Sequence, residues 1–173
     1  MDVKTTFLNS NIDQEIFIEQ LEGFVLHSKE SRVCRLKKAL YGFKQAPRVW
    51  YERIYGFLKD LGFQKSDADS NIYLRVIKNQ PLFLVLYVDD LFLTGEDNLI
   101  DWCKKELTNE FEMKDLGLLH YFLGLEVQQS KDEVFLSQGK YTVDILKKFS
   151  MLDCKSMTTP MVTNLKKLHD SDT

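Results

Sequence analysis

The sequence predicts an α+β fold in which antiparallel hairpins alternate with amphipathic helices. In the middle of the chain, two apolar runs of strand length flank the pair Asp89-Asp90, and Gly95 closes this unit. In two other segments, residues 47–61 and 97–111, apolar residues recur at helical spacing. Neighbouring strands joined by short turns pair antiparallel, so the sequence predicts hairpins rather than parallel crossovers.

Length and composition indicate a globular protein. The 173 residues suffice for one sizeable domain or for a domain with a small appendage. The hydrophobic share of 44% is ordinary, and no apolar run reaches membrane-spanning length. The N-terminus is charged and polar, unlike a signal peptide, and the three widely separated cysteines are typical of reduced thiols. We therefore expect an intracellular protein with no contact to a membrane.

The strands are predicted from alternation and from β-branched or aromatic content. Val3, Thr5 and Phe7 alternate with polar residues, which indicates a first strand that leads to a turn near Ser10. The run at residues 82–88 is apolar throughout and is expected to be buried on both faces. The remaining predicted strands are 15–19, 33–36, 72–76, 91–94, 121–127 and 133–137.

Three helices are predicted from apolar stripes. Pro47 suits the first turn of the first helix, and Gly62 is a plausible stop. Asp97 is expected to cap the second. The third ends near Met151, and the polar residues 155–173 are expected to form a loosely held tail. Its inward-facing residues are predicted to be Tyr141, Ile145, Leu146 and Phe149.

The Asp89-Asp90 pair has two interpretations. Aspartate is a favoured turn residue, so the pair can be a solvent-exposed turn with no further role. Adjacent carboxylates in an apolar setting also repel each other, and a divalent cation such as Mg²⁺ would offset that repulsion. The apolar runs on both sides and Tyr87 before the pair favour the metal site.

A basic segment lies upstream of this hairpin. The net charge of the chain is −3, but residues 32–53 contain seven Lys or Arg and one acid, which gives a local charge of +6. Such a segment is often just a solvated face. Beside an acidic pair, it is also what a metal-assisted enzyme acting on a polyanion requires.

Four motifs in order resemble the reverse transcriptases of Ty1/copia-type retrotransposons. They are Asp2-Val3-Lys4-Thr5, the run Leu-Lys-Lys-Ala-Leu-Tyr-Gly-Phe-Lys-Gln-Ala-Pro-Arg at 36–48, Tyr87-Val88-Asp89-Asp90, and Tyr-Phe-Leu-Gly-Leu-Glu-Val at 121–127. The resemblance covers residue 2 to about residue 161. It implies a polymerase palm, an antiparallel sheet backed by helices, at 1–118, and a primer-grip hairpin with the start of a thumb at 119–154.

By this resemblance, the chain is an RNA-directed DNA polymerase domain that adds deoxynucleotides to a primer 3′-hydroxyl. Its partners would be an RNA or DNA template-primer and a deoxynucleoside triphosphate. Two Mg²⁺ or Mn²⁺ ions, roughly 4 Å apart, would activate the hydroxyl and steady the leaving pyrophosphate. The implied catalytic and metal-binding residues are Asp2, Asp89 and Asp90.

The resemblance also implies substrate contacts. Phe7 would lie under the sugar of the nucleotide and disfavour a 2′-hydroxyl, although a core phenylalanine is an equally good interpretation. Gln45 would touch the nascent base pair. Lys114 would be either a proton donor to pyrophosphate or a surface lysine. The implied template-primer residues are Lys44, Pro47, Arg48, Tyr87, Val88, Leu123 and Gly124.

The chain also departs from the family pattern. Thr6 replaces a usual alanine, and Ser10 replaces a usual glycine, which predicts strain if that turn is left-handed. The fingers and ribonuclease H segments are not in this chain, so we expect the fragment alone to be inactive and upstream fingers to restore activity. The alternatives are a catalytically inactive remnant that binds nucleic acid through residues 32–53, and a pseudogene product without a role.

Overall fold

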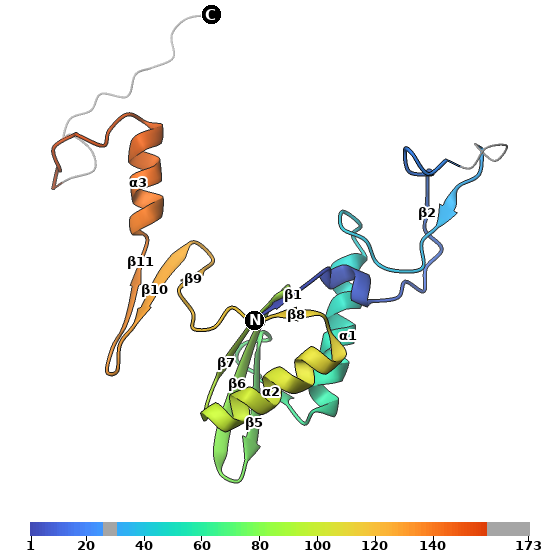
Figure 1. The fold of residues 1–173 in the computed structure, drawn as a ribbon, viewed down its shortest axis with the longest axis horizontal. Coiled ribbons are helices and arrows are strands. Elements are labelled where there is room, and N and C mark those ends of the chain that lie inside the picture. The colour runs from blue at the N-terminus through green and yellow to red at the C-terminus, as the bar shows by residue number, and fades with distance from the viewer. Residues whose placement is uncertain (26–30, 159–173) are drawn as a thin grey trace, which may run out of the picture. The chain divides into compact units, whose positions relative to one another are not determined.

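The computed structural model describes residues 1–25 and 31–158 (Figure 1). The chain divides into two compact units, the first from Met1 to Gly117 and the second from Leu118 onward. Each unit is described here by itself. The assignment of the two units to a palm and a thumb stays a prediction, and the predicted tail lies mostly outside the described residues.

The first unit contains a six-stranded sheet, a two-stranded sheet, two α-helices and a short 3₁₀ helix. The six-stranded sheet has the order β4-β5-β6-β7-β1-β8, and its neighbouring strands pair antiparallel. In chain order, the elements are β1 (Asp2–Val3), η1 (Thr6–Asn9), β2 (Phe17–Ile18), β3 (Cys34–Arg35), α1 (Ala46–Asp60), β4 (Gln64–Lys65), β5 (Ile72–Ile77), β6 (Gln80–Tyr87), β7 (Asp90–Thr94), α2 (Asp97–Glu110) and β8 (Met113–Lys114).

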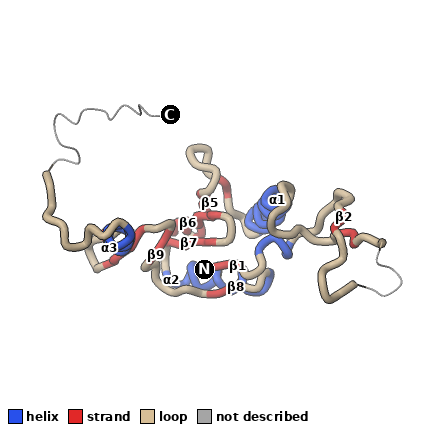
Figure 2. Tube along the Cα trace, turned by 90° about the horizontal axis from the view of Figure 1, so that it is seen from above, coloured by secondary structure: helices blue, strands red, loops and turns tan. Residues whose placement is uncertain are grey.

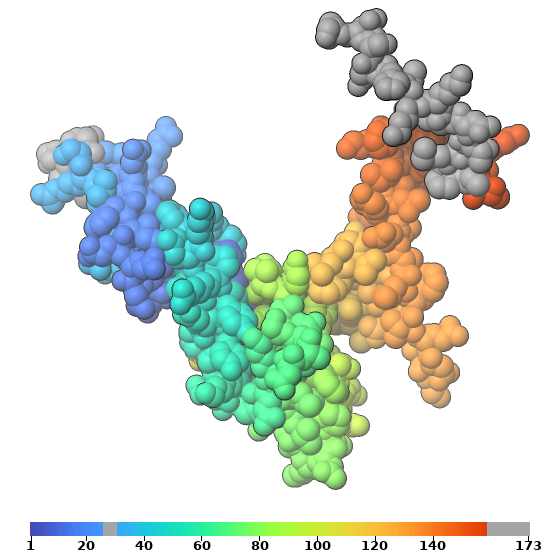
Figure 3. Space-filling model, turned by 180° about the vertical axis from the view of Figure 1, so that it is seen from behind, coloured from blue at the N-terminus to red at the C-terminus, as the bar shows by residue number. Residues whose placement is uncertain are grey.

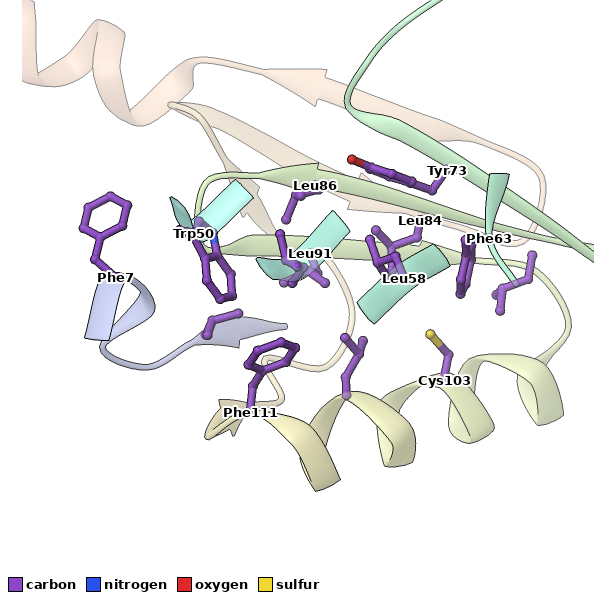
Figure 4. Packing of buried hydrophobic residues seen from close by; sticks show 14 of the residues in the cluster. Phe7, Trp50, Leu58, Phe63, Tyr73, Leu84, Leu86, Leu91, Cys103 and Phe111 are labelled. Carbon is purple, nitrogen blue, oxygen red and sulfur yellow. The ribbon is translucent and has the colours of Figure 1, made fainter. Parts of the chain in front are cut away.

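Both helices cover the same face of the six-stranded sheet. Leu82, Leu84 and Leu86 of β6 are buried, because they point into a core to which α1 and α2 contribute their apolar stripes. Figure 4 shows this packing, with Cys103 of α2 among the labelled core residues. The thiol is buried, and burial raises the pKa of Cys103 to about 12. In Figure 3, α1 (cyan) lies directly against the β5–β6 hairpin (green).

Within the described residues of the first unit, neither α1 nor α2 covers the other face of β6. Phe83 and Tyr87 are exposed, and they alternate along the strand with the buried leucines. The prediction that residues 82–88 are buried on both faces is therefore wrong. The view in Figure 2 shows α2 on one side of the β6–β7 strands within this unit. The antiparallel sheet thus has one dry face and one face open to a ligand.

The termini of α1 and α2 follow from local chemistry. Pro47 lies in the first turn of α1, as predicted. After the helix, Gly62 has φ +84°, and the amides of Gly62 and Phe63 donate to the carbonyls of Lys59 and Leu58. These two bonds form a Schellman motif, which confirms the predicted stop. The N-cap of α2 is Glu96 rather than the predicted Asp97.

The N-terminal strand is shorter than predicted. It ends at Val3, and Thr5 adopts a left-handed φ of 48° before η1 begins at Thr6. The hydroxyl of Thr6 is buried but donates to the carbonyl of Val3 at 2.8 Å. Ser10 has φ −116°, so the predicted left-handed strain does not arise there. Its buried hydroxyl has no hydrogen-bond partner among the described residues.

The second unit contains β9 (Tyr121–Phe122), β10 (Leu125–Gln129), β11 (Val134–Ser137) and α3 (Gly139–Lys148). The predicted single strand at 121–127 is in fact a hairpin. Leu123 and Gly124 have φ of 47° and 84°, so they form the two-residue turn of type I′. No described atom lies within 4 Å of a Cβ placed on Gly124. Glycine is therefore favoured here by the positive φ, and not by the close approach of another part of the chain.

The helix of the second unit does not bury its apolar face. Tyr141 and Phe149 are 56% and 63% exposed, while Ile145 and Leu146 are half-buried. The predicted inward orientation of Tyr141 and Phe149 is therefore wrong within this unit. Few apolar partners lie nearby, because Val127 is the buried hydrophobic residue among those described in this unit.

None of the helices in the described ranges is both long enough and apolar enough to cross a bilayer. The prediction of an intracellular location stays a prediction.

Candidate active site

The Asp89-Asp90 pair lies at the tight turn between β6 and β7. Tyr87 pairs with Asp90, so Val88 and Asp89 form a two-residue connection. Val88 has φ +54°, whereas Asp89 has a negative φ, which is the pattern of a type II′ turn. Glycine is the usual residue at the first position of this turn, and a β-branched side chain there is strained.

Asp2 is brought to this turn by strand pairing. In the β1–β7 ladder, Asp2 lies opposite Asp90. The amide of Val3 donates to the carbonyl of Asp89 at 2.9 Å, and the amide of Leu91 donates to the carbonyl of Met1 at 2.8 Å. Asp2 and Asp90 are therefore a non-hydrogen-bonded pair, the type in which cross-strand side chains come closest. Eighty-eight positions apart in sequence, the two carboxylates are direct neighbours in the sheet.

Alternation places these carboxylates on the uncovered face of the sheet. Val3 and Leu91, their chain neighbours, point into the core and are buried. On the other side of β1, Lys114 lies opposite Asp2 and is exposed. Lys114 thus lies in a strand, β8. A polymeric substrate can reach this acidic pair across the open face of the sheet.

The electrostatics of the turn match this geometry. The pKa of Asp90 is raised, chiefly by partial burial and then by the neighbouring charges of Asp89 and Asp2, while the Met1 ammonium acts in the opposite direction. That ammonium donates to the carbonyl of Leu91 at 2.8 Å. Like charges directly opposite each other on a sheet are destabilising, so the turn carries a repulsion that the Met1 ammonium partly offsets.

These residues fit a divalent cation by their chemistry. Within the described ranges, no three His, Cys, Asp or Glu side chains are already gathered around a common point for a metal ion. Carboxylate oxygens are nevertheless the ligands that Mg²⁺ and Mn²⁺ prefer, and a cation would relieve the repulsion that raises the pKa of Asp90. The assignment of Asp2, Asp89 and Asp90 as ligands of two ions stays a prediction.

A cavity of about 260 Å³ lies beside the turn. It brings together three residues that were predicted from distant parts of the sequence, Phe7, Pro47 and Val88. Phe7 is also largely buried, with its ring 4.5 Å from that of Tyr41, so both interpretations of Phe7 remain open. The other lining residues were not predicted as site residues: Trp50, Tyr51, Asn71 and Leu86.

The start of α1 carries the other predicted contacts of the first unit. Gln45 is the half-buried N-cap residue, and Lys44 and Arg48 on either side are exposed. Arg48 donates to Glu52 at 2.9 Å, one helical turn away. Further ion pairs in the basic segment join Arg35 to Glu15 and Arg53 to Glu110, whereas Arg32, Lys37 and Lys38 are exposed.

Leu123 and Gly124 lie in the second unit, at the β9–β10 turn, where Leu123 is 55% exposed. Their predicted role as a primer grip is not tested by the structure. Sequence reasoning missed one contact at the Asp pair. The indole Nε1 of Trp50 donates to the carbonyl of Val88 at 2.7 Å. The sequence signal for this contact is weak, since Trp50 falls within the apolar stripe of the helix predicted at residues 47–61.

Comparison with known proteins identifies the chain's relatives. Residues 1–163 match the family model described as "Reverse transcriptase (RNA-dependent DNA polymerase)". The chain is 40% identical over 170 residues to the "Retrovirus-related Pol polyprotein from transposon TNT 1-94" of Nicotiana tabacum, a match that covers 96% of this chain and 13% of the polyprotein. No solved structure shows a significant match.

Two further relatives show the same relationship. The Pol polyprotein from transposon RE2 of Arabidopsis thaliana is 37% identical over 167 residues, which is 96% of this chain and 12% of that polyprotein. The "Putative transposon Ty5-1 protein YCL074W" of Saccharomyces cerevisiae is 36% identical over 163 residues, covering 93% of this chain and 53% of that protein. The chain spans about an eighth of the length of the plant polyproteins it matches. It belongs to the reverse transcriptase (RNA-dependent DNA polymerase) family, among the domains found in copia-type retrotransposon Pol polyproteins.

Proposed function

We propose that the first unit is the palm of an RNA-directed DNA polymerase that transfers deoxynucleotides to a primer 3′-hydroxyl. One observation carries the proposal. Asp2 lies opposite Asp90, the neighbour of Asp89, on the face of the sheet that faces away from α1 and α2. Membership of the reverse transcriptase family supports the same reaction.

The three carboxylates would hold two divalent cations, Mg²⁺ or Mn²⁺. When bound, the ions supply Lewis acidity to the attacking hydroxyl and to the leaving pyrophosphate. Asp2 and Asp89 contribute oxygen ligands from two different elements, so the site requires the folded sheet. Asp90, with its raised pKa, must be ionised before it supports the ions, which links cation binding to proton release.

Substrate positioning is assigned to the surroundings of the turn. In this proposal, the 260 Å³ cavity receives part of the nucleotide or of the nascent base pair, because apolar and aromatic walls suit flat bases. Phe7 lies under the sugar, and Gln45 contacts the base. The template-primer contacts come from Lys44, Pro47, Arg48, Tyr87 and Val88 in the first unit and from Leu123 and Gly124 in the second.

The test is metal-dependent incorporation of a labelled deoxynucleotide on a primed RNA template. The assay is run on the chain and on a longer protein in which it replaces the matching segment of the TNT 1-94 polyprotein. We expect incorporation in the longer protein and its loss in Asp89→Asn. Glu96→Gln, which alters an exposed acid at the far end of β7, is the matched control. An active Asp89→Asn variant would refute the proposal.

A second candidate function is binding of nucleic acid without catalysis. It is favoured by the exposed lysines Lys37, Lys38 and Lys44 of the basic segment, and by the finding that no group of three metal-ligating side chains is gathered within the described ranges. Salt-sensitive RNA binding that ignores Mg²⁺ and Asp89→Asn, but is lost when these lysines become glutamine, would support it.

A further inference from the structure

We infer that Trp50 is a positioning residue that fixes the orientation of the Asp89-Asp90 turn through its indole N–H. The inference rests on the proposed function, because it assigns to Trp50 a role in the geometry of the same metal site. Trp50 belongs to α1, whereas the turn belongs to the β6–β7 hairpin, so the contact joins two separate elements.

The turn cannot fix its own geometry. Val88 holds a φ of +54°, a conformation that is strained for a β-branched residue and persists only where the surroundings impose it. Two donors from outside the hairpin bind successive carbonyls of this turn. Trp50 Nε1 binds the Val88 carbonyl at 2.7 Å, and the Val3 amide binds the Asp89 carbonyl at 2.9 Å.

The first of these bonds controls the peptide plane between Val88 and Asp89. A peptide carbonyl and the following amide move together, so the direction of the Val88 carbonyl also sets the backbone torsion of Asp89. Rotation of this plane would change ψ of Val88 and φ of Asp89, and with them the backbone from which the Asp89 side chain projects. The second bond anchors the turn to the strand that carries Asp2.

Trp50 is itself held in place. Its side chain is 2% exposed, and its ring packs edge-on against Phe111, with the ring centroids 5.4 Å apart. Phe111 is packed in turn against Phe57, which lies about two turns after Trp50 along α1. An indole fixed on several sides is a rigid donor, and a rigid donor can impose strain on the turn it binds.

The test compares Trp50→Phe with Trp102→Phe. Both variants exchange the same residue types, but Trp102 lies over the Arg75 guanidinium and has no bond to the turn. Manganese affinity is measured for the native chain, with Mn²⁺ alone as the probe, and the amide signals of Asp89 and Asp90 are followed by NMR. We expect Trp50→Phe to weaken Mn²⁺ binding about tenfold, the size typical of lost support behind a metal ligand, and to shift both amides. Trp102→Phe should do neither.

Stability separates positioning from simple packing. If Trp50 served the core alone, Trp50→Phe would lower the unfolding midpoint and leave the affinity of the folded protein for Mn²⁺ unchanged, which would overturn the inference. Unshifted Asp89 and Asp90 amides would overturn it as well. If Mn²⁺ binds the wild type and Asp89→Asn equally, the proposed function fails, and the amide shifts alone decide whether Trp50 orients the turn.

A measurement on the wild type guards against a variant that does not fold. The indole N–H signal of Trp50 should shift when Mg²⁺ is added, because the ion would bind carboxylates of the turn whose Val88 carbonyl accepts the indole hydrogen bond. The indole signal of Trp102 is the internal control and should stay in place. A Trp50 signal that ignores Mg²⁺, while the Asp89 amide responds to it, would contradict the inference.

Discussion

Each unit has a hairpin turn with a non-glycine residue at positive φ, and the two turns lie in different surroundings. The β6–β7 turn of the first unit and the β9–β10 turn of the second both place a non-glycine residue, Val88 or Leu123, at positive φ. Val88 has its carbonyl bound by Trp50 and lies in a six-stranded sheet with a helical layer. Leu123 is followed by Gly124 in a three-stranded sheet with one buried hydrophobic residue, Val127.

The difference teaches where strain can be kept. A turn embedded in a packed core tolerates an unfavourable residue, because neighbouring elements impose its conformation. A turn in a thinly packed unit depends on its own residues, and Gly124 supplies the permissive conformation there. In the β6–β7 turn, the strained residue adjoins the acidic pair, so the contacts that hold the strained backbone also restrict the position of the two carboxylates.

The largest expected effect concerns packing. Leu84→Ala removes a fully buried side chain from the first unit and should lower the free energy of unfolding by about 2–5 kcal/mol. Leu136→Ala in the second unit removes a side chain that is 57% exposed and should change it by less than about 0.5 kcal/mol. Urea denaturation followed by circular dichroism checks both. Equal losses of unfolding free energy in the two variants would contradict the inference that the first unit is more tightly packed than the second.

A smaller effect is expected from two glycines. Gly95→Ala would place a Cβ 2.8 Å from the carbonyl oxygen of Pro81, so the backbone must shift, at a cost of about 1–3 kcal/mol. Gly124→Ala meets open space but must keep φ +84°, which costs about 1 kcal/mol. Thermal unfolding of both variants shows which substitution lowers the unfolding midpoint more. A more damaging Gly124→Ala would show that the second turn is the more constrained one.

Relief of strain should give gains of about 1 kcal/mol. Val88→Gly and Leu123→Gly each place glycine where φ is positive, so each should raise the free energy of unfolding by that amount. Only Val88→Gly should also change the affinity for Mn²⁺, because only Val88 adjoins the acidic pair. If Leu123→Gly altered Mn²⁺ binding to the same extent, the functional distinction between the turns would be lost.

The smallest effect concerns charge at the first turn. The folded-state pKa of Asp90 is raised, so the folded protein binds this proton more tightly than the unfolded chain does. The contribution of Asp90 to the free energy of unfolding should therefore fall as the pH rises from the pKa of Asp90 in the unfolded chain through its higher pKa in the folded protein. Asp90→Asn should remove this loss, making the variant relatively more stable at pH 7 than at pH 3. Stability curves against pH, without divalent ions, measure the difference.

Asp115 provides the control of opposite sign. Lys104 lies 2.8 Å from Asp115, and its hydrogen bond lowers the pKa of that carboxyl. The Lys104–Asp115 pair should contribute about 0.2–1 kcal/mol to stability, the range for a partly exposed pair. This contribution is present above the pKa of Asp115 in the unfolded chain and is lost as the pH falls through its lower pKa in the folded protein. Asp115→Asn should therefore destabilise the protein at pH 7 and leave it unchanged at low pH. If Asp90→Asn and Asp115→Asn changed stability at pH 7 in the same direction, the opposite pKa shifts assigned to these two carboxyls would be contradicted.

Sequence patterns predicted the regular parts of the fold well. The limits of α1 follow from Pro47 and Gly62, whose effects are local, and the β6–β7 hairpin follows from its two apolar runs. The pattern failed where tertiary contacts decide. The uncovered face of β6 keeps apolar residues such as Phe83, so composition could not show that only one face is buried.

The candidate site was predictable only in part. The Asp89-Asp90 turn is a local signal, but Asp2 joined it through a family resemblance, and no spacing rule connects positions so far apart. The break in the predicted strand after Val3 depends on the left-handed Thr5, which no turn residue announces. The bond from Trp50 to Val88 is invisible in sequence, because a tryptophan in an apolar stripe is usually read as packing alone.

The place of β1 in its sheet affects how the fold is reached. β1 lies between β7 and β8, so it pairs with two strands that follow it at long distance in the sequence. Asp2 must meet Asp90 on one side and Lys114 on the other before the ladder is complete. Such long loops must close before pairing rewards them, so this step should be slow. The acidic constellation should thus form late in folding, because it depends on distant pairings.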